Sequence, residues 1–546
     1  MDQAEKATEI KRVFQQLETK RQPYESVWKE VTEFVLPRRS VWEIDNDGPA
    51  PPSKLYNSHA LQALKLQTYG FEGYMVSRSR PWFKLRVPEK VRRSYGVSDY
   101  LEKSEQIVLE ALAASNFYEA AGEFIMDGGG IGTATCFCDE DQRTGKVYFS
   151  TRHPKEIYIA DNHRGEADMV FRRFRITKRA AMQRWGKKNH ERVQADVEKD
   201  PFGYVQMIHC IQPRTDRNPR SMLSTDFPWS SIYLDLDNNH IVAEGGYEER
   251  PFFAWRWNKN SDEVYGRSPG IDALTDVKML NQVSRTRLNL AHLTSDPPWN
   301  VPITIKGNER ILPHGMNYIT KGEQVSPVVV GANYPINVDV EKKIEKVIDD
   351  HFNVQFFLMI SNMEREMTAR EVMERKGEQA AVLGAAIGRF ENEFLAPAIM
   401  RVAGILGRQG AFPERPAALD EAGPITIEYT GYLSQLQRRF YETGGISESV
   451  SFILPLAQMD PTVLDNIDMD ELARTAADGF GLPQKILREI ADVDKIRALK
   501  AQQQQQAAQQ QQQLAAQQTI AQNANKLNEP VNAGSVLQKL VGGGGQ

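Results

Sequence analysis

The stretch Val264-Tyr265-Gly266-Arg267-Ser268-Pro269-Gly270 opens a long predicted helix and decides how the rest of the chain is interpreted. Proline suits the first turn of a helix, because the N–H that it lacks is one that the helix leaves unpaired. From Ile271, apolar residues recur at three- and four-residue steps until the chain reaches Asp296-Pro297-Pro298. At 1.5 Å per residue, a helix over 271–295 would be roughly 37 Å long. The sequence therefore predicts a turn, a long helix and an abrupt stop.

The same stretch contains Gly266-Arg267-Ser268-Pro269-Gly270, which matches the G-x-S-x-G pattern around the nucleophile of many hydrolases. In those enzymes the residue after the serine donates its backbone N–H to the oxyanion hole. Here that residue is Pro269, which has no N–H to donate. We therefore interpret the motif as the start of a helix and not as a nucleophile.

A second helix is predicted over 338–357, and a module rich in proline and glycine over 298–337 separates it from the first. Its predicted apolar face holds Val340, Ile344, Val347, Ile348 and Phe352. Its other face is charged and holds Glu341, Lys342, Lys343, Glu345, Lys346, Asp349 and Asp350. Two helices around a compact insert indicate a structural part, which favours a non-enzymatic function.

The first half of the chain is predicted to mix helices and strands. Helices are expected over 4–36, ending at Pro37, after a cap at Asn57 or Ser58, and over 99–126. The last of these is expected to break at Asp127-Gly128-Gly129-Gly130-Ile131-Gly132. Short β-rich segments with one short helix follow, at 133–139, 148–151, 157–160, 169–175, 205–211, 232–236 and 241–245. Residues 130–257 are therefore predicted to be an α+β region with a small mixed or antiparallel sheet.

The second half is predicted to be mainly helical. Thr368-Ala369-Arg370-Glu371 fits a capping box at the start of a helix of about forty residues, which Pro397 should kink and Gly410 should end. A short strand over 425–429 and further helices up to Leu499 follow. The tail from Gln502 to Gln518 is mostly glutamine and alanine, with no apolar face to bury. It is expected to be disordered, or helical only against neighbouring subunits.

The composition is that of a folded protein, with 41% hydrophobic and 25% charged residues in a chain of 546. The net charge of −5 argues against a surface that grips nucleic acid throughout, but a passage for DNA needs no strong attraction. Three cysteines, Cys136, Cys138 and Cys210, form no disulfide framework and indicate a reducing compartment. No apolar run is long enough to span a membrane, and the N-terminus has no signal-peptide core.

A search for catalytic motifs leaves no candidate. The chain has no G-x-x-x-x-G-K-[ST] phosphate loop and no H-E-x-x-H metal motif, and Gly128–Gly132 follows a helix without G-x-G-x-x-G spacing. The acidic pairs Asp235/Asp237 and Asp468/Asp470 are interpreted as turn or cap residues, and Glu248/Glu249 as solvated. We therefore predict no catalytic residue, no metal site and no cofactor.

Several segments together resemble the portal proteins, or head-to-tail connectors, of short-tailed (podovirus-type) bacteriophages. These segments, in order, are Ser79–Leu85, Arg250-Pro251-Phe252 with Trp255, Tyr265–Gly270, Asp296-Pro297-Pro298, Met367–Val372, and Glu393, Leu395 and Pro397. The resemblance covers roughly residues 5–480 and leaves out the glutamine-rich tail. No single motif decides it, but the ordered set is specific.

The resemblance implies an α+β, mainly helical subunit with wing, stem, clip and crown that assembles into a ring, usually of twelve copies. The implied divisions are an N-terminal and wing part (1–265), a first stem helix (266–297), a clip (298–337), a second stem helix (338–357), a tunnel loop (358–367), a long wing or crown helix with a return strand (368–429), a helical crown (430–500) and the tail (501–546). In this scheme Tyr265, Gly266, Arg267, Pro269 and Gly270 are the stem-entry motif.

The function implied by the resemblance is a ring-shaped channel at one capsid vertex, through which double-stranded DNA is packaged and later ejected. Implied partners are further copies of the chain, the terminase large subunit, the major capsid and scaffolding proteins and a tail adaptor, in a virion assembled in the host cytoplasm. Lys342, Lys346, Asp349 and Arg365 are candidates for charges that face the channel. Two alternatives stay open: a tail or adaptor ring component without a packaging role, and a metal-dependent hydrolase that uses an acidic cluster.

Overall fold

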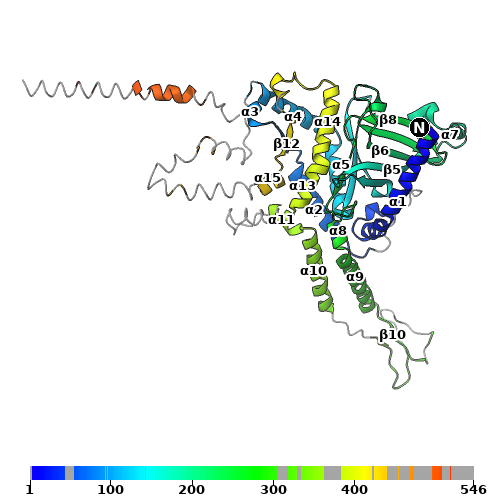
Figure 1. The fold of residues 1–546 in the computed structure, drawn as a ribbon. Coiled ribbons are helices and arrows are strands. Elements are labelled where there is room, and N and C mark those ends of the chain that lie inside the picture. The colour runs from blue at the N-terminus through cyan, green and yellow to red at the C-terminus, as the bar shows by residue number, and fades with distance from the viewer. Residues whose placement is uncertain are drawn as a thin grey trace, which may run out of the picture. The chain divides into compact units, whose positions relative to one another are not determined.

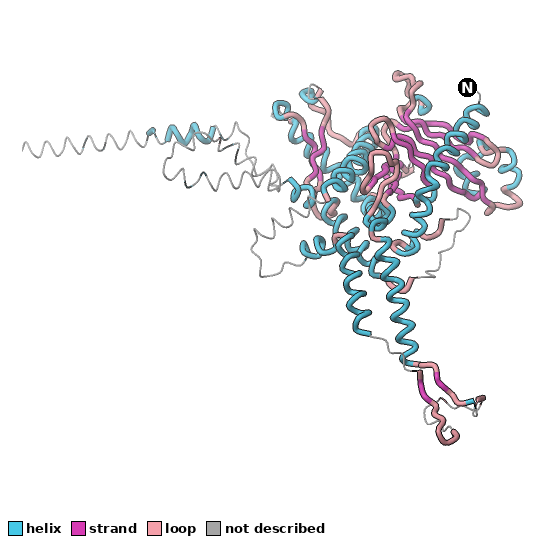
Figure 2. The backbone as a smooth tube through the Cα atoms, turned by 60° about the horizontal axis from the view of Figure 1, so that its bottom comes forward, coloured by secondary structure: helices cyan, strands magenta, loops and turns pink. Residues whose placement is uncertain are grey.

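The chain divides into two compact units, Met1–Glu448 and Ser449–Gln546. The computed structural model describes residues 3–42, 55–438 and scattered residues between 453 and 517, with gaps at 93, 95, 142, 304–305, 308–310, 312–317, 329–333, 362–382 and 421–422. The first unit combines helices with antiparallel sheets (Figures 1 and 2). The predicted α+β class is therefore confirmed.

The larger sheet has five antiparallel strands in the order β4-β5-β6-β7-β8. Its strands are β4 (Ile157–Asp161), β5 (Ala167–Thr177), β6 (Tyr204–Pro213), β7 (Trp229–Asp235) and β8 (His240–Tyr247). Helix α1 (Gln3–Phe34) lies along one face and buries an apolar stripe there, with Phe14 4.7 Å from the Tyr158 ring. The short helices α6 (Lys178–Trp185) and α7 (Glu191–Asp196) lie between β5 and β6. The sequence left open whether this sheet is mixed or antiparallel, and the structure shows that it is antiparallel.

The smaller sheet has the order β3-β2-β9 and is also antiparallel. Strands β2 (Thr133–Glu140) and β3 (Val147–Arg152) match predicted segments, but β9 (Phe252–Arg256) was not predicted. All five residues of β9 are buried, so the strand shows no alternation of apolar and polar side chains. Cys136 and Cys138 of β2 are buried, and their thiols are free.

Two helices replace the single helix predicted over 99–126. They are α4 (Val97–Ala114) and α5 (Phe117–Ile131), and the predicted break at Asp127–Gly132 is wrong because Gly128–Gly130 are helical. A Cβ atom on Gly128 would come within 2.4 Å of the Trp255 ring, and one on Gly129 within 2.8 Å of Gln67 Oε1. The glycines therefore allow close packing inside a helix, and α5 ends only at Gly132, where φ is +95°.

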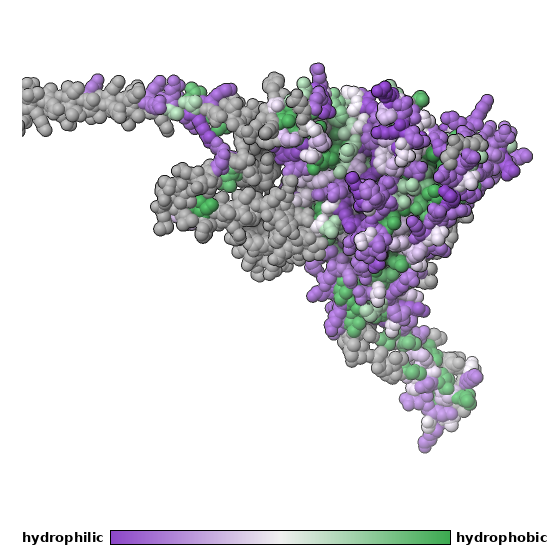
Figure 3. All heavy atoms as spheres, viewed as in Figure 1, coloured by the Kyte–Doolittle hydropathy of each residue, from purple (hydrophilic) through white to green (hydrophobic). Residues whose placement is uncertain are grey.

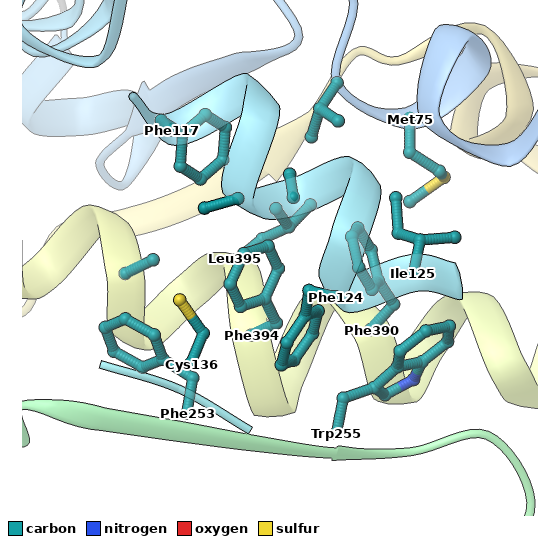
Figure 4. Packing of buried hydrophobic residues seen from close by; sticks show 14 of the residues in the cluster. Met75, Phe117, Phe124, Ile125, Cys136, Phe253, Trp255, Phe390, Phe394 and Leu395 are labelled. Atoms are coloured by element: carbon teal, nitrogen blue, oxygen red, sulfur yellow. The ribbon is translucent and has the colours of Figure 1, made fainter. Parts of the chain in front are cut away.

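The main core lies where α5 and the smaller sheet meet a helical segment from the C-terminal half (Figure 4). That segment consists of α13 (Gly384–Phe390), a π-helix (Glu391–Leu395) and α14 (Ala396–Arg408). Phe394 stacks on Phe124 with ring centroids 4.2 Å apart, and Phe390 packs edge-on against Trp255 at 4.9 Å. The irregularity expected at Pro397 is a π-helix that ends two residues before it. The capping box at Thr368 lies outside the described residues.

Further helices and a strand pair complete this part of the first unit. Strand β1 (Phe83–Arg86) pairs with β12 (Thr426–Tyr429), which confirms the short strand predicted over 425–429. Helix α2 (His59–Met75) packs on α5, and the Asn57 side chain accepts a hydrogen bond from the His59 N–H at 2.8 Å. The short helices α3 (Glu89–Arg92) and α15 (Tyr432–Arg438) also belong to this unit.

A pair of helices runs side by side away from the rest of the first unit (Figures 1 and 2). The first is α9 (Leu274–Ser295), which follows the short helix α8 (Pro269–Asp272) after a break at Ala273. The second is α10 (Tyr334–His351). Between them, β10 (Trp299–Asn300) pairs with β11 (Ser326–Pro327) at the far end of the pair.

The second helix ends earlier than predicted, at His351 instead of Phe357. Asn353 has a φ of +53°, a conformation that α-helices do not contain, and a new helix α11 (Val354–Ser361) begins after it. The first residues of the loop predicted over 358–367 are therefore helical, and residues 362–367 lie outside the described ones.

The structure describes few residues of the second unit. Residues 495–503 are helical, and Arg497 Nη2 donates to Asp470 Oδ1 at 2.7 Å. Most of the predicted C-terminal helices and of the glutamine-rich tail lie outside the described residues.

Candidate functional site

The stretch Tyr265–Gly270, expected to be the stem-entry motif, lies at the base of the helical pair, where it starts α8, and all of its residues except Arg267 are buried. The Ser268 side chain accepts a hydrogen bond from the Ile271 N–H at 3.1 Å and donates one to the Gly130 carbonyl at 2.8 Å. Pro269 occupies the first turn of α8, as predicted. Ser268 is therefore a helix cap whose hydroxyl is fully used, which agrees with the turn interpretation.

Tyr265 and Arg267 lie on opposite sides of this turn. Tyr265 is buried, its ring lies 5.1 Å from those of Tyr24 and Trp28, and its hydroxyl accepts a hydrogen bond from the Ile159 N–H. Burial raises the pKa of Tyr265 above its usual value, so the hydroxyl stays neutral. Arg267 is exposed and pairs with Glu263 at 2.7 Å. The turn is thus held by contacts to α1 and the larger sheet.

Gly266 and Gly270 pack their backbones against the C-terminal end of α5. A Cβ atom on Gly266 would lie 2.3 Å from the Gly132 carbonyl oxygen, and one on Gly270 would lie 2.4 Å from that of Gly130. Glycine is needed at both positions because no side chain fits between the two backbones. The two glycine-rich stretches of the sequence therefore form one contact.

The α9–α10 pair is joined by polar contacts as well as by apolar packing. Glu341 is only 5% exposed and accepts a hydrogen bond from the Ser284 hydroxyl at 2.8 Å, and Arg287 also pairs with it. At the base, His351 Nε2 lies 3.4 Å from Asp276 Oδ2. These contacts fix the register of the two antiparallel helices, so that Met279 and Val347 lie at about the same position along the axis of the pair.

The predicted faces of the second helix need correction. Glu341 was expected on the charged face but lies against α9, together with Ile344 and Ile348. Val340 and Val347 were expected in the buried stripe but are 40% and 42% exposed. At about 100° per residue they lie roughly 90° around the helix from the face that contacts α9. Within the described part of the chain, α10 thus has an apolar face that stays exposed.

Helix α9 also has an uncovered face, which is uncharged over its whole length. Thr275, Met279, Gln282, Thr286 and Leu293 are exposed and share this face at helical spacing. The space-filling view shows apolar atoms at the surface along the pair and over the module at its end (Figure 3). Exposed apolar residues in that module are Trp299, Ile303, Ile311, Tyr318, Ile319 and Val328.

The four residues predicted to face a channel have different surroundings. Lys342 and Lys346 are exposed on the side of α10 away from α9. Asp349 is half-buried, and its Oδ1 lies 2.9 Å from Nε2 of His59 on α2. Arg365 lies outside the described residues. Lys342 and Lys346 therefore lie together, and Asp349 contacts another helix of the same chain.

The acidic pairs turn out to have structural partners. Asp235 accepts hydrogen bonds from the N–H groups of Asp237 and Asn238, which confirms a turn, and Asp468 accepts one from the Asp470 N–H. Glu248 and Glu249, expected to be a solvated pair, both bind Arg408 instead. Among the described residues, no group of three or more histidine, cysteine or acidic side chains could hold a metal ion. Within the same part of the chain, no helix is long and apolar enough to cross a membrane.

Sequence reasoning missed a buried charged cluster around Arg256. Its guanidinium donates to Asp161 at 2.8 Å and to Glu393 at 2.6 Å, and it also donates to the Val264 carbonyl just before the stem-entry motif. One signal was present, because Arg256 is the only charged residue within the apolar run Phe252–Trp257. The cluster ties the base of the helical pair to β4 and to the π-helix.

The geometry can be compared with known proteins. The family model of the bacteriophage head to tail connecting protein matches residues 7–487, which include the helical pair and its base. The chain belongs to this family. The match ends before the glutamine-rich tail and leaves out residues 488–546.

Two relatives of this head-to-tail connecting protein are similar over almost their full lengths. A portal protein of Salmonella phage epsilon15 is 30% identical over 547 residues, with 97% of this chain and 96% of the relative covered. A probable portal protein of Bordetella phage BPP-1 is 28% identical over 505 residues, with 90% of each chain covered. The family resemblance seen in the sequence is thereby confirmed.

Proposed function

We propose that this connector is a portal subunit, which assembles with copies of itself into a ring at one capsid vertex. Double-stranded DNA would be packaged and ejected through the centre of that ring. The α9–α10 pair would be the stem, residues 298–337 the clip and residues 1–265 the N-terminal part and wing. Family membership and the two similar portal proteins support the function.

The observation that carries ring assembly is the pair of uncovered faces on the two helices. One is the uncharged face of α9 around Met279, and the other is the apolar face of α10 with Val340 and Val347. They are different surfaces on the same subunit. A contact between the first face of one copy and the second face of the next is head-to-tail, and its repetition gives a ring where the rotation between neighbours closes.

The contact also has a specific register. Within one subunit, Asp276 contacts His351 and Ser284 contacts Glu341. Along the axis of the pair, Met279 is therefore level with Val347, and Thr286 is level with Val340. In a ring whose axis runs along the helices, neighbours stand at equal height. Met279 of one copy would therefore meet Val347 of the next.

This packing leaves the Lys342 and Lys346 side of α10 free. At about 100° per residue, that side lies roughly 145° from the face on α9 and roughly 130° from the valine face. We assign it to the channel wall. Asp339 and Asp350 lie close to it around the helix, and such mixed charge would give a sliding duplex no deep electrostatic trap.

The module at the end of the pair is the surface for docking other proteins in this proposal. Ile303 and Tyr318 are 88% and 83% exposed. Large apolar side chains that are exposed together in this way are typical of protein–protein interaction surfaces. A terminase large subunit would cover them during packaging and a tail adaptor afterwards. Capsid and scaffolding proteins would contact other parts of the ring.

Cysteine cross-linking tests the ring directly. The native cysteines Cys136, Cys138 and Cys210 are buried, so they should not interfere. The double variant Met279→Cys with Val347→Cys should give a ladder of disulfide-linked oligomers on oxidation, and each single variant should not. In the double variant, substitution of Lys342 by Ala should leave the ladder unchanged.

Electron microscopy of the purified protein separates the alternatives. A ring with a central hole, together with the ladder, supports the portal proposal. A compact monomer with metal-dependent nuclease activity would overturn it. A ring whose Lys342→Ala, Lys346→Ala double variant packages and retains DNA as well as wild type would remove the channel assignment of these two lysines.

A further inference from the structure

The end of β5 and the helical segment that joins it to β6 are strongly basic. Residues 172–200 hold ten basic and four acidic side chains, in a chain whose net charge is −5. Five of the basic residues are exposed on α6, on the 3₁₀ turn that follows it and on α7, and we call them the outer basic surface: Arg179, Arg184, Lys187, Lys188 and Arg192. Because the chain as a whole is acidic, this concentration of positive charge is a local property of one surface.

The nearby acidic residues leave this surface positive. Asp196 and Asp200 lie 3.6 and 3.4 Å from Nζ of Lys178, which is not one of the five. None of the five has an ion pair within the described part of the chain. The other two acids of the segment, Glu191 and Glu198, are exposed. The outer basic surface therefore keeps an excess of positive charge.

The same positive charge acts inside the larger sheet. Arg184 donates a hydrogen bond to the Tyr233 hydroxyl at 2.9 Å, and the Tyr233 ring is stacked on that of His209 at 3.9 Å. Burial is the first cause that lowers the pKa of His209 well below its usual value, and the charges of Arg172 and Arg184 are the next. A further cation is therefore unfavourable here, and an anion on the outside of the segment is favourable.

The turn that carries the two lysines has a fixed backbone. The Gln194 side chain donates a hydrogen bond to the Lys187 carbonyl at 3.1 Å, and Nε2 of His240 lies 3.0 Å from the Lys188 carbonyl oxygen. These contacts occupy carbonyl oxygens that would otherwise repel an approaching anion. The lysine side chains therefore extend from a support that needs no ordering when an anion binds.

The outer basic surface lies away from the side of the subunit that is assigned to the channel. In Figure 1, α7 lies at one edge of the first unit, and α11 and α13 lie toward the opposite edge. Within the helical pair, α10 is on the side of α11, and its side with Lys342 and Lys346 is turned away from α9. A partner bound to the outer basic surface therefore meets the outside of the proposed ring.

The surface has the composition that a phosphate backbone requires. None of the large apolar side chains of α6, of the 3₁₀ turn or of α7 is exposed. A protein partner usually buries an apolar centre, which this surface does not offer. A duplex needs only cations spaced along its phosphates, and their binding releases counterions from the nucleic acid. The charge and the lack of exposed apolar groups together favour DNA.

We propose that the outer basic surface binds the phosphate backbone of double-stranded DNA on the outside of the ring. The inference rests on the proposed function for the presence of duplex DNA beside the ring, whereas the binding itself is a property of each subunit. Contacts to phosphates carry no sequence information, so a duplex of any sequence should bind.

A covalently closed circular duplex separates this surface from the channel. Such a circle has no end, so it cannot pass through a ring that is already closed. Pre-assembled wild-type rings are mixed with a fluorescent circle of arbitrary sequence at several salt concentrations, and the bound fraction is measured by co-sedimentation. The circle should bind, and its affinity should fall as the salt concentration rises.

The triple variant Lys187→Ala, Lys188→Ala, Arg192→Ala removes three of the five charges at exposed positions. It should bind the circle at least about tenfold more weakly at low salt. The slope of log affinity against log salt should be smaller by about 3, because each phosphate contact contributes about 0.9. The variant Lys187→Arg, Lys188→Arg, Arg192→Lys keeps the charge and should bind as wild type does.

The matched control removes the same charge from the opposite face of the same sheet. That face is covered by α1, whereas α6 and α7 pack on the other one. The triple variant Lys11→Ala, Arg12→Ala, Lys20→Ala on α1 should bind the circle as wild type does. An equal loss in both alanine variants would mean that only total charge matters and would contradict a defined surface.

Other outcomes would also overturn the inference. Binding of a linear duplex but not of the circle places the contact in the channel. Competition by polyglutamate as strong as that by duplex DNA of the same total charge means that the surface takes acidic protein chains. If wild type forms no ring but still binds the circle through these residues, the proposed function fails and this inference stands. If rings form and the first triple variant binds like wild type, the inference alone fails.

Discussion

Gly266 and Gly132 lie backbone to backbone, so that a Cβ atom on either residue would come within 2.3 Å of the carbonyl oxygen of the other. The Gly266 N–H also donates to the Thr133 hydroxyl at 2.8 Å. This contact joins the end of α5 to the start of the helical pair. The direction in which α9 and α10 extend from the rest of the first unit therefore depends on these two glycines.

Substitution of Gly132 or Gly266 by Ala should destabilise the protein by at least about 2 kcal/mol, because the backbones must move apart. Gly132→Ala carries an added strain, since its φ is +95°. Urea unfolding followed by circular dichroism measures both. Gly73→Ala is the matched control, because a Cβ atom there meets nothing within 4 Å. It should stabilise α2 by up to about 1 kcal/mol. Equal effects at Gly73 and Gly266 would contradict the proposed close contact.

Glu341 should hold α9 and α10 together. Glu341→Ala leaves the Ser284 hydroxyl and Arg287 without their acceptor and should cost about 1–2 kcal/mol; Arg287 is 40% exposed, so water can replace part of the loss. Hydrogen exchange of α9 amides should accelerate in this variant. Lys343→Ala, on the exposed side of the same helix, should leave exchange unchanged.

Glu105 should make stability fall as the pH rises. Burial raises its pKa to about 7, although the Leu85 N–H donates to its carboxyl group at 2.6 Å. Because the folded pKa lies above the unfolded value of about 4.5, the stabilising contribution is complete below pH 4.5 and is lost as the pH rises through about 7. The advantage of Glu105→Gln over wild type should grow across this window, to at most about 3 kcal/mol at pH 8. A constant difference between pH 5 and pH 8 would refute it.

His153 should act in the opposite direction. Its Nδ1 accepts a hydrogen bond from the Lys155 N–H, so its Nε2–H donates to the Arg39 carbonyl and the ring is neutral. Burial, Arg39 and Lys155 lower its pKa to about 3. The folded pKa lies below the unfolded value of about 6.5, so this contribution to stability is present above pH 6.5 and is lost as the pH falls toward 3. NMR titration should show no protonation of His153 between pH 7 and 5. His163, for comparison, is exposed.

The order of the elements could be read from local patterns. The spacing of apolar residues predicted α1, α9 and the strands of the larger sheet, and Pro269 predicted the first turn of the helix at this point. The missing N–H of Pro269 was enough to exclude a serine nucleophile at Ser268, since this property belongs to the residue itself. The ordered motifs were enough to recognise the family that the comparisons confirm.

Other features depend on which neighbour a residue meets. Periodicity assigned Val340 and Val347 to the buried face and Glu341 to the exposed one, but α9 approaches α10 from a different side. Gly128–Gly130 were predicted to form a turn, but they are helical. Glycine is required there because Trp255 and α2 pack directly against the backbone of α5, and a local segment does not show which residues will pack against it. Strand β9 was missed since burial on both faces removes the alternation that marks a strand.

The helix boundaries at Ser268, Pro269 and Pro297 follow from the local sequence, because capping and proline geometry act within a few residues. Membership of the head-to-tail connecting family follows from the order of the motifs along the chain. The contact of Gly132 with Gly266 and the burial of Glu341 are instead properties of the tertiary fold. They arise from contacts between segments 50 or more residues apart, and no local pattern records them.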